Sequence, residues 1–445
     1  MGGGAEMPPG PADLGPVLAE SGLERGVLGL RFSGVPLAAI AEAVGTPTYV
    51  YSADVIQRRY RALDEALAAV PHQICFAVKA NSNLGVLRIL RDAGAGADLV
   101  SGGELRRALA AGFSPDQLVF SGVGKSRAEL REAAETGVGH VNVESLEELD
   151  RLAEVADEIG RHVAVGVRVN PDVTAETHPY ISTGQGGIKF GVPADQVAEA
   201  VRRIGARPRL RLTCLAMHLG SQLVEPGPYA EGIARLLKLV AEARAAGARD
   251  LEAVDIGGGI GIRYADEPGM DLERFAAAVV TPLRPLGVTV YLEPGRYLVG
   301  PAGVLLTEVL YRKHSGGKDF VIVDAAMNDL LRPSLYQAWH GVVEVTPKGR
   351  PVRPVDVVGP ICETGDFLAL ARPLPEVEPG ERLAILGAGA YGFVMSSNYN
   401  TRGRAAEVLI SEGRWAVVRP REATEELYKT EAVDPFTPVT VGKGR

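Results

Sequence analysis

The chain has 445 residues, of which 46% are hydrophobic and 23% charged, and its formal net charge at pH 7 is -8. This is an ordinary globular composition, and the length suffices for two or three domains. An acidic balance without a long Lys/Arg block argues against nucleic acid as the main partner, and no apolar stretch is long enough to cross a membrane.

The N-terminus and the cysteines favour a cytoplasmic protein. Residues Met1–Gly10 carry neither a basic region nor an apolar core, so we expect a disordered leader rather than a secretory signal. The cysteines, Cys75, Cys214 and Cys362, are odd in number and far apart. Their spacing predicts neither a disulfide framework nor a metal site.

Short apolar strands alternate with amphipathic helical segments between Pro71 and Arg296. The expected helices include Ser101–Ala111, Lys125–Thr136, Ser145–Ile159 and Tyr229–Ala246. The expected strands are His72–Ala80, Ala97–Ser101, Gln117–Gly122, His140–Glu144, His162–Asn170, Leu210–Leu219, Leu251–Gly258 and Val288–Glu293. Alternation implies a parallel sheet, and about eight such units make a closed (β/α)8 barrel. Residues 46–298 are therefore predicted to form an α/β barrel domain.

After Pro301 the strands come closer together, and Pro and Gly clusters separate them. The expected strands are Leu305–Tyr311, Phe320–Val323, Arg353–Val358, Arg382–Leu386, Ala405–Ile410 and Trp415–Val418. This spacing predicts a mainly antiparallel β domain over residues 299–445. Residues 1–45 are assigned to the leader and an N-terminal part of the same domain.

Lys79 ends the first expected barrel strand. Because side chains alternate along a strand, Cys75, Ala77 and Lys79 would share one face of small residues that leads to a single amine. An ammonium in apolar surroundings loses proton affinity and becomes a usable nucleophile. An isolated lysine of this kind would more often reach solvent, but the C-terminal ends of barrel strands carry chemistry. Lys79 is therefore the candidate Schiff-base lysine.

Two more motifs follow expected barrel strands. The ring of His218 could stack on a flat cofactor, although a lone histidine there is more often a core residue bonded to a carbonyl. The glycines Gly257–Gly259 would let backbone N–H groups approach an anion closely, and a plain tight turn is the alternative.

The sequence Glu-Pro-Gly-Arg at Glu293–Arg296 ends the last expected barrel strand. A carboxylate pairs well with a protonated pyridine nitrogen, and a guanidinium suits a phosphate or a carboxylate. A mutual ion pair is the alternative. This motif is more specific than the glycine turn.

Two motifs lie in the expected β domain. Cys362 and Glu363 place a thiol beside a carboxylate in a loop, although a buried cysteine acting as a small hydrophobe is the alternative. Residues Gly387–Gly392 formally match a dinucleotide-binding pattern, but neither the helix nor the further strand–helix units that such a fold needs follow. We expect these glycines to present Tyr391 instead.

Together these residues supply an amine, a ring-stacking imidazole, a phosphate cradle and a carboxylate for a pyridinium, which fits pyridoxal 5′-phosphate. The set resembles the fold-type III pyridoxal-phosphate decarboxylases, and within them the diaminopimelate decarboxylase subfamily. The resemblance runs from about Gly45 to Ile410, and the stretch Asn328–Tyr336 separates this subfamily from the basic-amino-acid decarboxylases. The motifs that carry it are Phe76–Asn81, His218–Gln222, Gly257–Gly259, Glu293–Arg296, Met327–Tyr336, Cys362–Glu363, Tyr391–Gly392 and Ser397–Asn400.

The resemblance implies a role for each candidate residue. Lys79 would hold the cofactor covalently, His218 would stack on its ring and Glu293 would pair with the pyridine nitrogen. The residues that would hold the phosphate are Ser221, Gly258, Gly259, Gly295, Arg296 and Tyr391. The residues that would contact the substrate are Arg296, Arg332, Tyr336, Glu363 and Tyr391. Cys362 would return a proton to the substrate carbon, and Cys362 and Glu363 would come from the partner subunit of a homodimer.

The implied reaction is decarboxylation of meso-2,6-diaminopimelate to L-lysine and CO2, the last step of lysine biosynthesis. The nearest alternative is a decarboxylase of arginine, ornithine or carboxynorspermidine, but Arg332 disfavours a cationic substrate tail. A racemase on a similar barrel and an inactive regulatory homologue are further alternatives. Cys362 argues against the racemase, and retention of Lys79, Glu293 and Cys362 argues against the inactive homologue.

Overall fold

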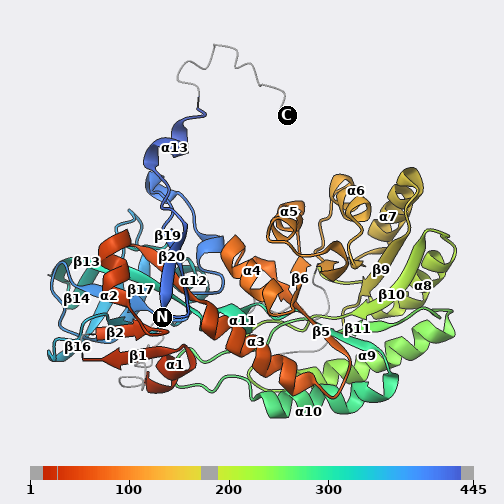
Figure 1. Ribbon diagram of the computed structural model, residues 1–445, viewed down its shortest axis with the longest axis horizontal. Coiled ribbons are helices and arrows are strands. Elements are labelled where there is room, and N and C mark those ends of the chain that lie inside the picture. The colour runs from red at the N-terminus through yellow and green to blue at the C-terminus, as the bar shows by residue number, and fades with distance from the viewer. Residues whose placement is uncertain (1–13, 28, 172–188, 432–445) are drawn as a thin grey trace.

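Eight parallel strands close into a barrel in the computed structural model, which describes residues 14–27, 29–171 and 189–431 (Figure 1). Around the barrel the strand order is β10-β11-β12-β5-β6-β7-β8-β9, and the pairing of β12 with β5 closes the ring. The strands are β5 (His72–Ala77), β6 (Gly96–Leu99), β7 (Leu118–Phe120), β8 (His140–Val143), β9 (Val163–Arg168), β10 (Leu210–Ala216), β11 (Ala253–Asp255) and β12 (Thr289–Leu292). The predicted barrel is confirmed, with strands shorter than expected.

Helices surround the barrel strands (Figure 1). They are α3 (Ala53–Leu67), α4 (Leu84–Asp92), α5 (Gly102–Ala110), α6 (Arg127–Thr136), α7 (Leu146–Ile159), α8 (Val197–Gly205), α9 (Gly227–Ala245) and α10 (Leu272–Leu283). Local sequence sets their ends. The side chain of Ser126 caps α6 by accepting from the N–H of Glu129, and Gly137 ends the helix with a left-handed φ of 77°.

The second domain is built on a mostly antiparallel sheet with the strand order β17-β16-β14-β13-β4-β19-β20. Its strands are β4 (Thr48–Ser52), β13 (Gly303–Ser315), β14 (Lys318–Val323), β16 (Val352–Val358), β17 (Phe367–Pro375), β19 (Ala406–Ser411) and β20 (Arg414–Arg419), and β18 (Arg382–Ile385) joins β13 to β15 (Val342–Glu344). Two pairs are parallel, β14 with β16 and β19 with β4. The predicted β domain is confirmed.

The start of the chain contributes to the β domain. The helices α1 (Gly15–Glu20) and α2 (Leu37–Val44) flank a small sheet of β1 (Leu23–Gly26), β2 (Gly29–Phe32) and β3 (Val35–Pro36). The N–H of Leu30 bonds to the carbonyl of Val345 at 2.7 Å. Strand β4 falls within the range predicted for the barrel, 46–298, yet it pairs with β13 and β19 of the large sheet.

The predicted leader, Met1–Gly10, lies outside the described residues. Cys75 and Cys214 are buried, Cys362 is exposed, and none of the three forms a disulfide. In the described part of the chain, no helix is both long enough and apolar enough to span a membrane. The same part holds no group of three or more His, Cys, Asp or Glu side chains that could bind a metal ion.

Candidate active site

Lys79 lies just beyond the first barrel strand. Strand β5 ends at Ala77, and Val78–Ala80 form a single 3₁₀ turn, so the alternation that predicted a shared face stops before Lys79. From this turn the Lys79 Nζ donates a hydrogen bond of 3.0 Å to Asp98 Oδ2 on β6. The amine thus lies at the C-terminal ends of two neighbouring strands, where barrel enzymes place their chemistry.

The expectation that Lys79 lies in apolar surroundings is wrong. Burial alone would lower the pKa of the Lys79 ammonium, but the carboxylates of Asp98 and Glu293 outweigh burial, and the pKa lies above its ordinary value. Without a cofactor the amine is therefore an ammonium held by carboxylates. Sequence alternation missed this because Asp98 comes from a different strand.

Three buried acids face this end of the barrel, namely Asp98, Asp255 and Glu293, which are 0%, 0% and 8% exposed. Burial, followed by the charge of Asp255, raises the pKa of Glu293 well above its usual range. Burial also raises the pKa of Asp255 to about 6. Within the described residues, Asp98 Oδ1 and Asp255 Oδ2 are buried without a hydrogen-bond partner. Acids in this state favour a cationic group among them, and a protonated pyridine nitrogen fits that requirement.

His218 follows β10 and has a neutral ring. Its Nδ1 accepts the N–H of Gly258 at 3.1 Å, which places the ring hydrogen on Nε2. Burial, then the charges of Arg168 and Lys79, lower the pKa of His218 well below its usual value. A neutral ring beside Lys79 suits stacking on an aromatic cofactor.

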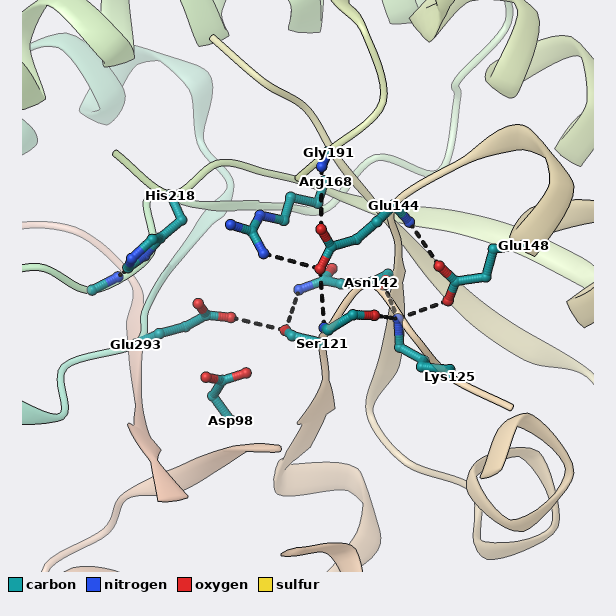
Figure 2. Close-up of polar contacts among 12 residues, drawn as sticks. Asp98, Ser121, Lys125, Asn142, Glu144, Glu148, Arg168, Gly191, His218 and Glu293 are labelled. Carbon is teal, nitrogen blue, oxygen red and sulfur yellow. Dashed lines mark hydrogen bonds and ion pairs between the residues drawn. The ribbon is translucent and has the colours of Figure 1, made fainter. Parts of the chain in front are cut away.

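A polar network beside Glu293 and His218 holds Arg168 and Ser121 in place (Figure 2). Glu144 accepts hydrogen bonds from Arg168 at 2.9 Å, from the N–H of Gly122 at 3.0 Å and from the N–H of Gly191 at 3.1 Å. The Asn142 amide donates to the Ser121 hydroxyl at 3.2 Å, and that hydroxyl donates to Glu293 Oε1 at 3.3 Å. The network fixes the Glu293 carboxylate and the guanidinium of Arg168, whose charge acts on His218.

The glycines after β11 allow close backbone approach. The φ angles are +72° at Gly257 and +104° at Gly259, values that favour glycine. A Cβ on Gly258 would lie 2.2 Å from the carbonyl oxygen of Glu293, and one on Gly259 would lie 2.4 Å from that of Gly220. A side chain at either place would separate this loop from the turns that carry Ser221 and Arg296. The glycine loop and these two turns could then no longer bind one anion together.

Arg296 and Arg332 come together from different domains. Arg296 begins α11 (Arg296–Val299) after β12, and Arg332 begins α12 (Arg332–Tyr336) in the β domain. Arg296 donates to Ser221 Oγ at 3.0 Å and lies 5.0 Å from the centre of the Tyr391 ring. The N–H of Tyr391 in turn bonds to the carbonyl of Ala80, next to Lys79, at 2.8 Å. The Tyr336 phenol is close enough to Arg296 to act on it electrostatically.

Cys362 and Glu363 are exposed in the single chain. The N–H of Cys362 bonds to the Asn400 side chain at 3.0 Å, and Glu363 raises the pKa of the neighbouring Tyr399 phenol through a hydrogen bond. Their neighbours are thus residues of their own domain. Both side chains lie at the surface of the single chain rather than in the site around Lys79.

Known proteins identify the family. A family model described as "Pyridoxal-dependent decarboxylase, pyridoxal binding domain" matches residues 53–300. The chain is 53% identical to the diaminopimelate decarboxylase of Pseudomonas aeruginosa over 402 residues, which is 90% of this chain and 96% of that protein. The corresponding enzyme of Vibrio cholerae is 46% identical over the same shares of the two chains. The chain belongs to the diaminopimelate decarboxylase family.

Solved structures agree with membership of the diaminopimelate decarboxylase family. The crystal structure of the Helicobacter pylori diaminopimelate decarboxylase complexed with L-lysine has a TM-score of 0.85 and 40% identity, and the match covers 88% of this chain and 98% of that one. A lysine/ornithine decarboxylase from Vibrio vulnificus complexed with putrescine is more distant, with a TM-score of 0.75 and 25% identity over 84% and 97% of the two chains. The predicted enzyme class and pyridoxal phosphate as the cofactor are confirmed.

Several residues that contact or flank the candidate site residues were not predicted from the sequence. They are Asp98, Ser121, Glu144, Arg168, Asp255, Tyr264 and His340. The first five lie at or directly after the ends of barrel strands, and this position could have identified them as candidates from the sequence. Tyr264 and His340 lie in loops, so only the folded chain shows where they point.

Proposed function

We propose that this chain decarboxylates meso-2,6-diaminopimelate to L-lysine and CO2, the last step of lysine biosynthesis. The observation that supports this substrate is the buried pair of guanidiniums, Arg296 and Arg332, which are 7% and 6% exposed. Within the described residues their side-chain hydrogen bonds go to Tyr264, Ser221 and His340, and none of these is a carboxylate. Buried cations without an anionic partner favour an incoming carboxylate.

Lys79, Glu293 and His218 would hold the cofactor. When bound, pyridoxal phosphate supplies an electron sink for the pair released by the breaking carbon–carboxylate bond. The Lys79 amine would bind it covalently, and Glu293, within the acid cluster, would pair with the pyridine nitrogen and keep it protonated. The neutral imidazole of His218 would stack on the cofactor ring.

The phosphate would lie against the glycine loop. Backbone N–H groups in glycine-rich turns suit anions, and the hydroxyl of Ser221 lies 3.0 Å from Arg296. The residues assigned to the phosphate are Ser221, Gly258, Gly259, Gly295, Arg296 and Tyr391. Because Arg296 also lies beside Arg332, it connects the phosphate end of the site with the substrate end.

The far end of the substrate sets its orientation. Arg296, Arg332 and Tyr336 would bind the carboxylate that is retained, with Tyr391 alongside. Binding at that end would fix the orientation of the reacting end of the substrate relative to Lys79, Glu293 and His218. Remote binding then serves rate as well as affinity.

Cys362 and Glu363 would reach the site from a second copy of the chain. Their exposure on one chain supports a homodimer in which Cys362 returns a proton to the reacting carbon and Glu363 binds the distal amino group. Three unpaired cysteines also support a reducing, cytoplasmic setting.

The test is an assay of the purified enzyme, loaded with pyridoxal phosphate, with meso-diaminopimelate, ornithine and arginine. We expect lysine and CO2 in equal amounts from diaminopimelate and little turnover of the two basic amino acids, whose cationic tails would face Arg332. Faster turnover of ornithine or arginine would contradict the proposal and favour a basic-amino-acid decarboxylase.

A further inference from the structure

Tyr264 lies between the two guanidiniums of the candidate substrate site. Its hydroxyl oxygen accepts hydrogen bonds from Arg296 Nη1 at 2.7 Å and from Arg332 Nη1 at 2.8 Å. The side chain is 8% exposed. Glu267 holds the loop that carries Tyr264 by accepting the N–H of Tyr264 at 2.9 Å. One phenol thus links an arginine of the barrel to an arginine of the β domain.

His340 bonds to the same Nη1 of Arg332 that donates to Tyr264. Its Nδ1 lies 2.8 Å from the carbonyl oxygen of Leu386, so Nδ1 carries the hydrogen and donates it. The remaining ring nitrogen, Nε2, then accepts from Arg332 Nη1 at 3.1 Å. His340 is 0% exposed, and burial and the charge of Arg332 lower its pKa well below the usual value. The ring therefore stays neutral and keeps the lone pair that Arg332 needs.

We propose that Tyr264 and His340 are positioning residues for the carboxylate that the substrate retains. They hold Arg296 and Arg332 at a fixed separation, so that both guanidiniums can bind one carboxylate without first being ordered. This inference rests on the proposed function, because it takes the guanidinium pair as the substrate-carboxylate site. Pre-ordering these long side chains lowers the entropy cost of binding.

The proposal concerns binding, so it can be tested without turnover. Diaminopimelate has two amino-acid ends, and loss of CO2 from one leaves L-lysine with the carboxylate of the other. Lysine therefore retains the group that the guanidiniums would hold, whereas cadaverine, its decarboxylated counterpart, lacks that group. The ratio of their dissociation constants therefore measures how much the carboxylate contributes to binding.

The experiment compares binding of L-lysine and cadaverine to the pyridoxal-phosphate-loaded enzyme by titration calorimetry. The variants are Tyr264→Phe, His340→Leu and His340→Gln. Tyr60→Phe is the matched control, because Tyr60 is a buried tyrosine on α3 that is 6% exposed. Each variant is first checked for the absorbance band of bound cofactor and for its thermal midpoint.

Tyr264→Phe should weaken lysine binding about tenfold, the usual effect of losing a buried hydrogen bond to a charged group. Cadaverine binding should change by less than about twofold, because no carboxylate is involved. His340→Leu should act in the same direction, and His340→Gln should recover part of the loss, because its amide oxygen can accept from Arg332. In turnover, KM for diaminopimelate should rise far more than kcat falls.

Equal weakening of lysine and cadaverine would overturn the proposal and indicate a general structural role. Unchanged lysine binding in Tyr264→Phe and His340→Leu would overturn it as well. Two positions are tested, so that if a variant at one of them lacks the cofactor band, the variants at the other position decide the outcome. If the wild-type enzyme neither prefers lysine to cadaverine nor converts diaminopimelate, the proposed function itself fails. If the wild type does both and the variants match it, only this inference fails.

Discussion

The Nζ of Lys79 lies 3.0 Å from Oδ2 of Asp98, a carboxylate that is completely buried. The contact keeps the candidate nucleophile protonated, although a nucleophilic amine must be neutral. Before Lys79 can bind a carbonyl, its proton has to leave the Lys79–Asp98 pair. Asp98 therefore both positions the amine and restrains it.

The pH dependence of cofactor capture should change in Asp98→Asn. Asp98 is the strongest of the charges that raise the pKa of Lys79, so its neutralisation lowers that pKa and increases the neutral amine at any given pH. The rate at which cofactor-free protein captures pyridoxal phosphate should rise with pH, and the rise should begin at a lower pH in the variant. Stopped-flow absorbance measures this. Asp92→Asn, at the exposed C-terminal end of α4, is the control. If the capture rate begins to rise at the same pH in Asp98→Asn as in the wild type, the role of the Lys79–Asp98 pair is contradicted.

Lys79→Ala should abolish covalent attachment of the cofactor and nearly all turnover, because the variant lacks the amine at the barrel mouth. Borohydride reduction followed by peptide mapping should label Lys79 in the wild-type protein and no residue in the variant. Label on Lys125, the buried lysine bonded to Glu148 at 2.7 Å, would show that the wrong amine was chosen.

Arg332→Ala should reduce kcat/KM for diaminopimelate strongly and leave cofactor occupancy unchanged. Removing the charged partner of a buried carboxylate costs ~2–5 kcal/mol, which corresponds to roughly 30-fold or more in kcat/KM. The measurement pairs steady-state kinetics with cofactor absorbance. An unchanged kcat/KM would remove Arg332 from the site, and lost occupancy would reassign it to the cofactor.

Inactive subunits should complement one another if Cys362 crosses a dimer interface. Mixing Lys79→Ala with Cys362→Ala subunits gives mixed dimers that hold one complete site of two. Random exchange makes half the dimers mixed, so about a quarter of wild-type activity is expected. Mass spectrometry confirms the exchange. Absence of activity in confirmed mixed dimers would mean that each site is built from one chain.

The cofactor-free protein should lose stability as the pH falls from 6.5 to about 4. Burial lowers the pKa of His140 to about 4, whereas in the unfolded chain the group takes up a proton near pH 6.5. The unfolded state thus binds more protons in this window, and the contribution of His140 to the free energy of unfolding drops by about 3 kcal/mol. Urea unfolding across this pH window should show that the free energy of unfolding falls less steeply with decreasing pH in His140→Gln than in the wild type. The exposed His314→Gln is the control, and equal slopes for His140→Gln and the wild type would contradict the assignment.

Much of the fold could be predicted from local patterns. Strand and helix alternation depends on which neighbouring residues share a face, and the predicted barrel strands all recur in the structure at nearly the same positions. Short motifs that end strands, such as Glu293–Arg296, could also be found, because the fold places strand ends at one mouth. Strand β4 could not be assigned to the β domain, since its partners β13 and β19 lie far along the chain.

The sequence by itself therefore determined the barrel, the β domain and the residue types needed for pyridoxal-phosphate chemistry, because these depend on local periodicity and short motifs. Tertiary structure alone decided the electrostatics of the site. Asp98 and Glu293 come from other strands to keep Lys79 protonated, and Tyr264 meets Arg332 across 68 residues of chain and a domain boundary. Burial and the charges of distant residues set these properties, and neither can be read from neighbouring residues in the sequence.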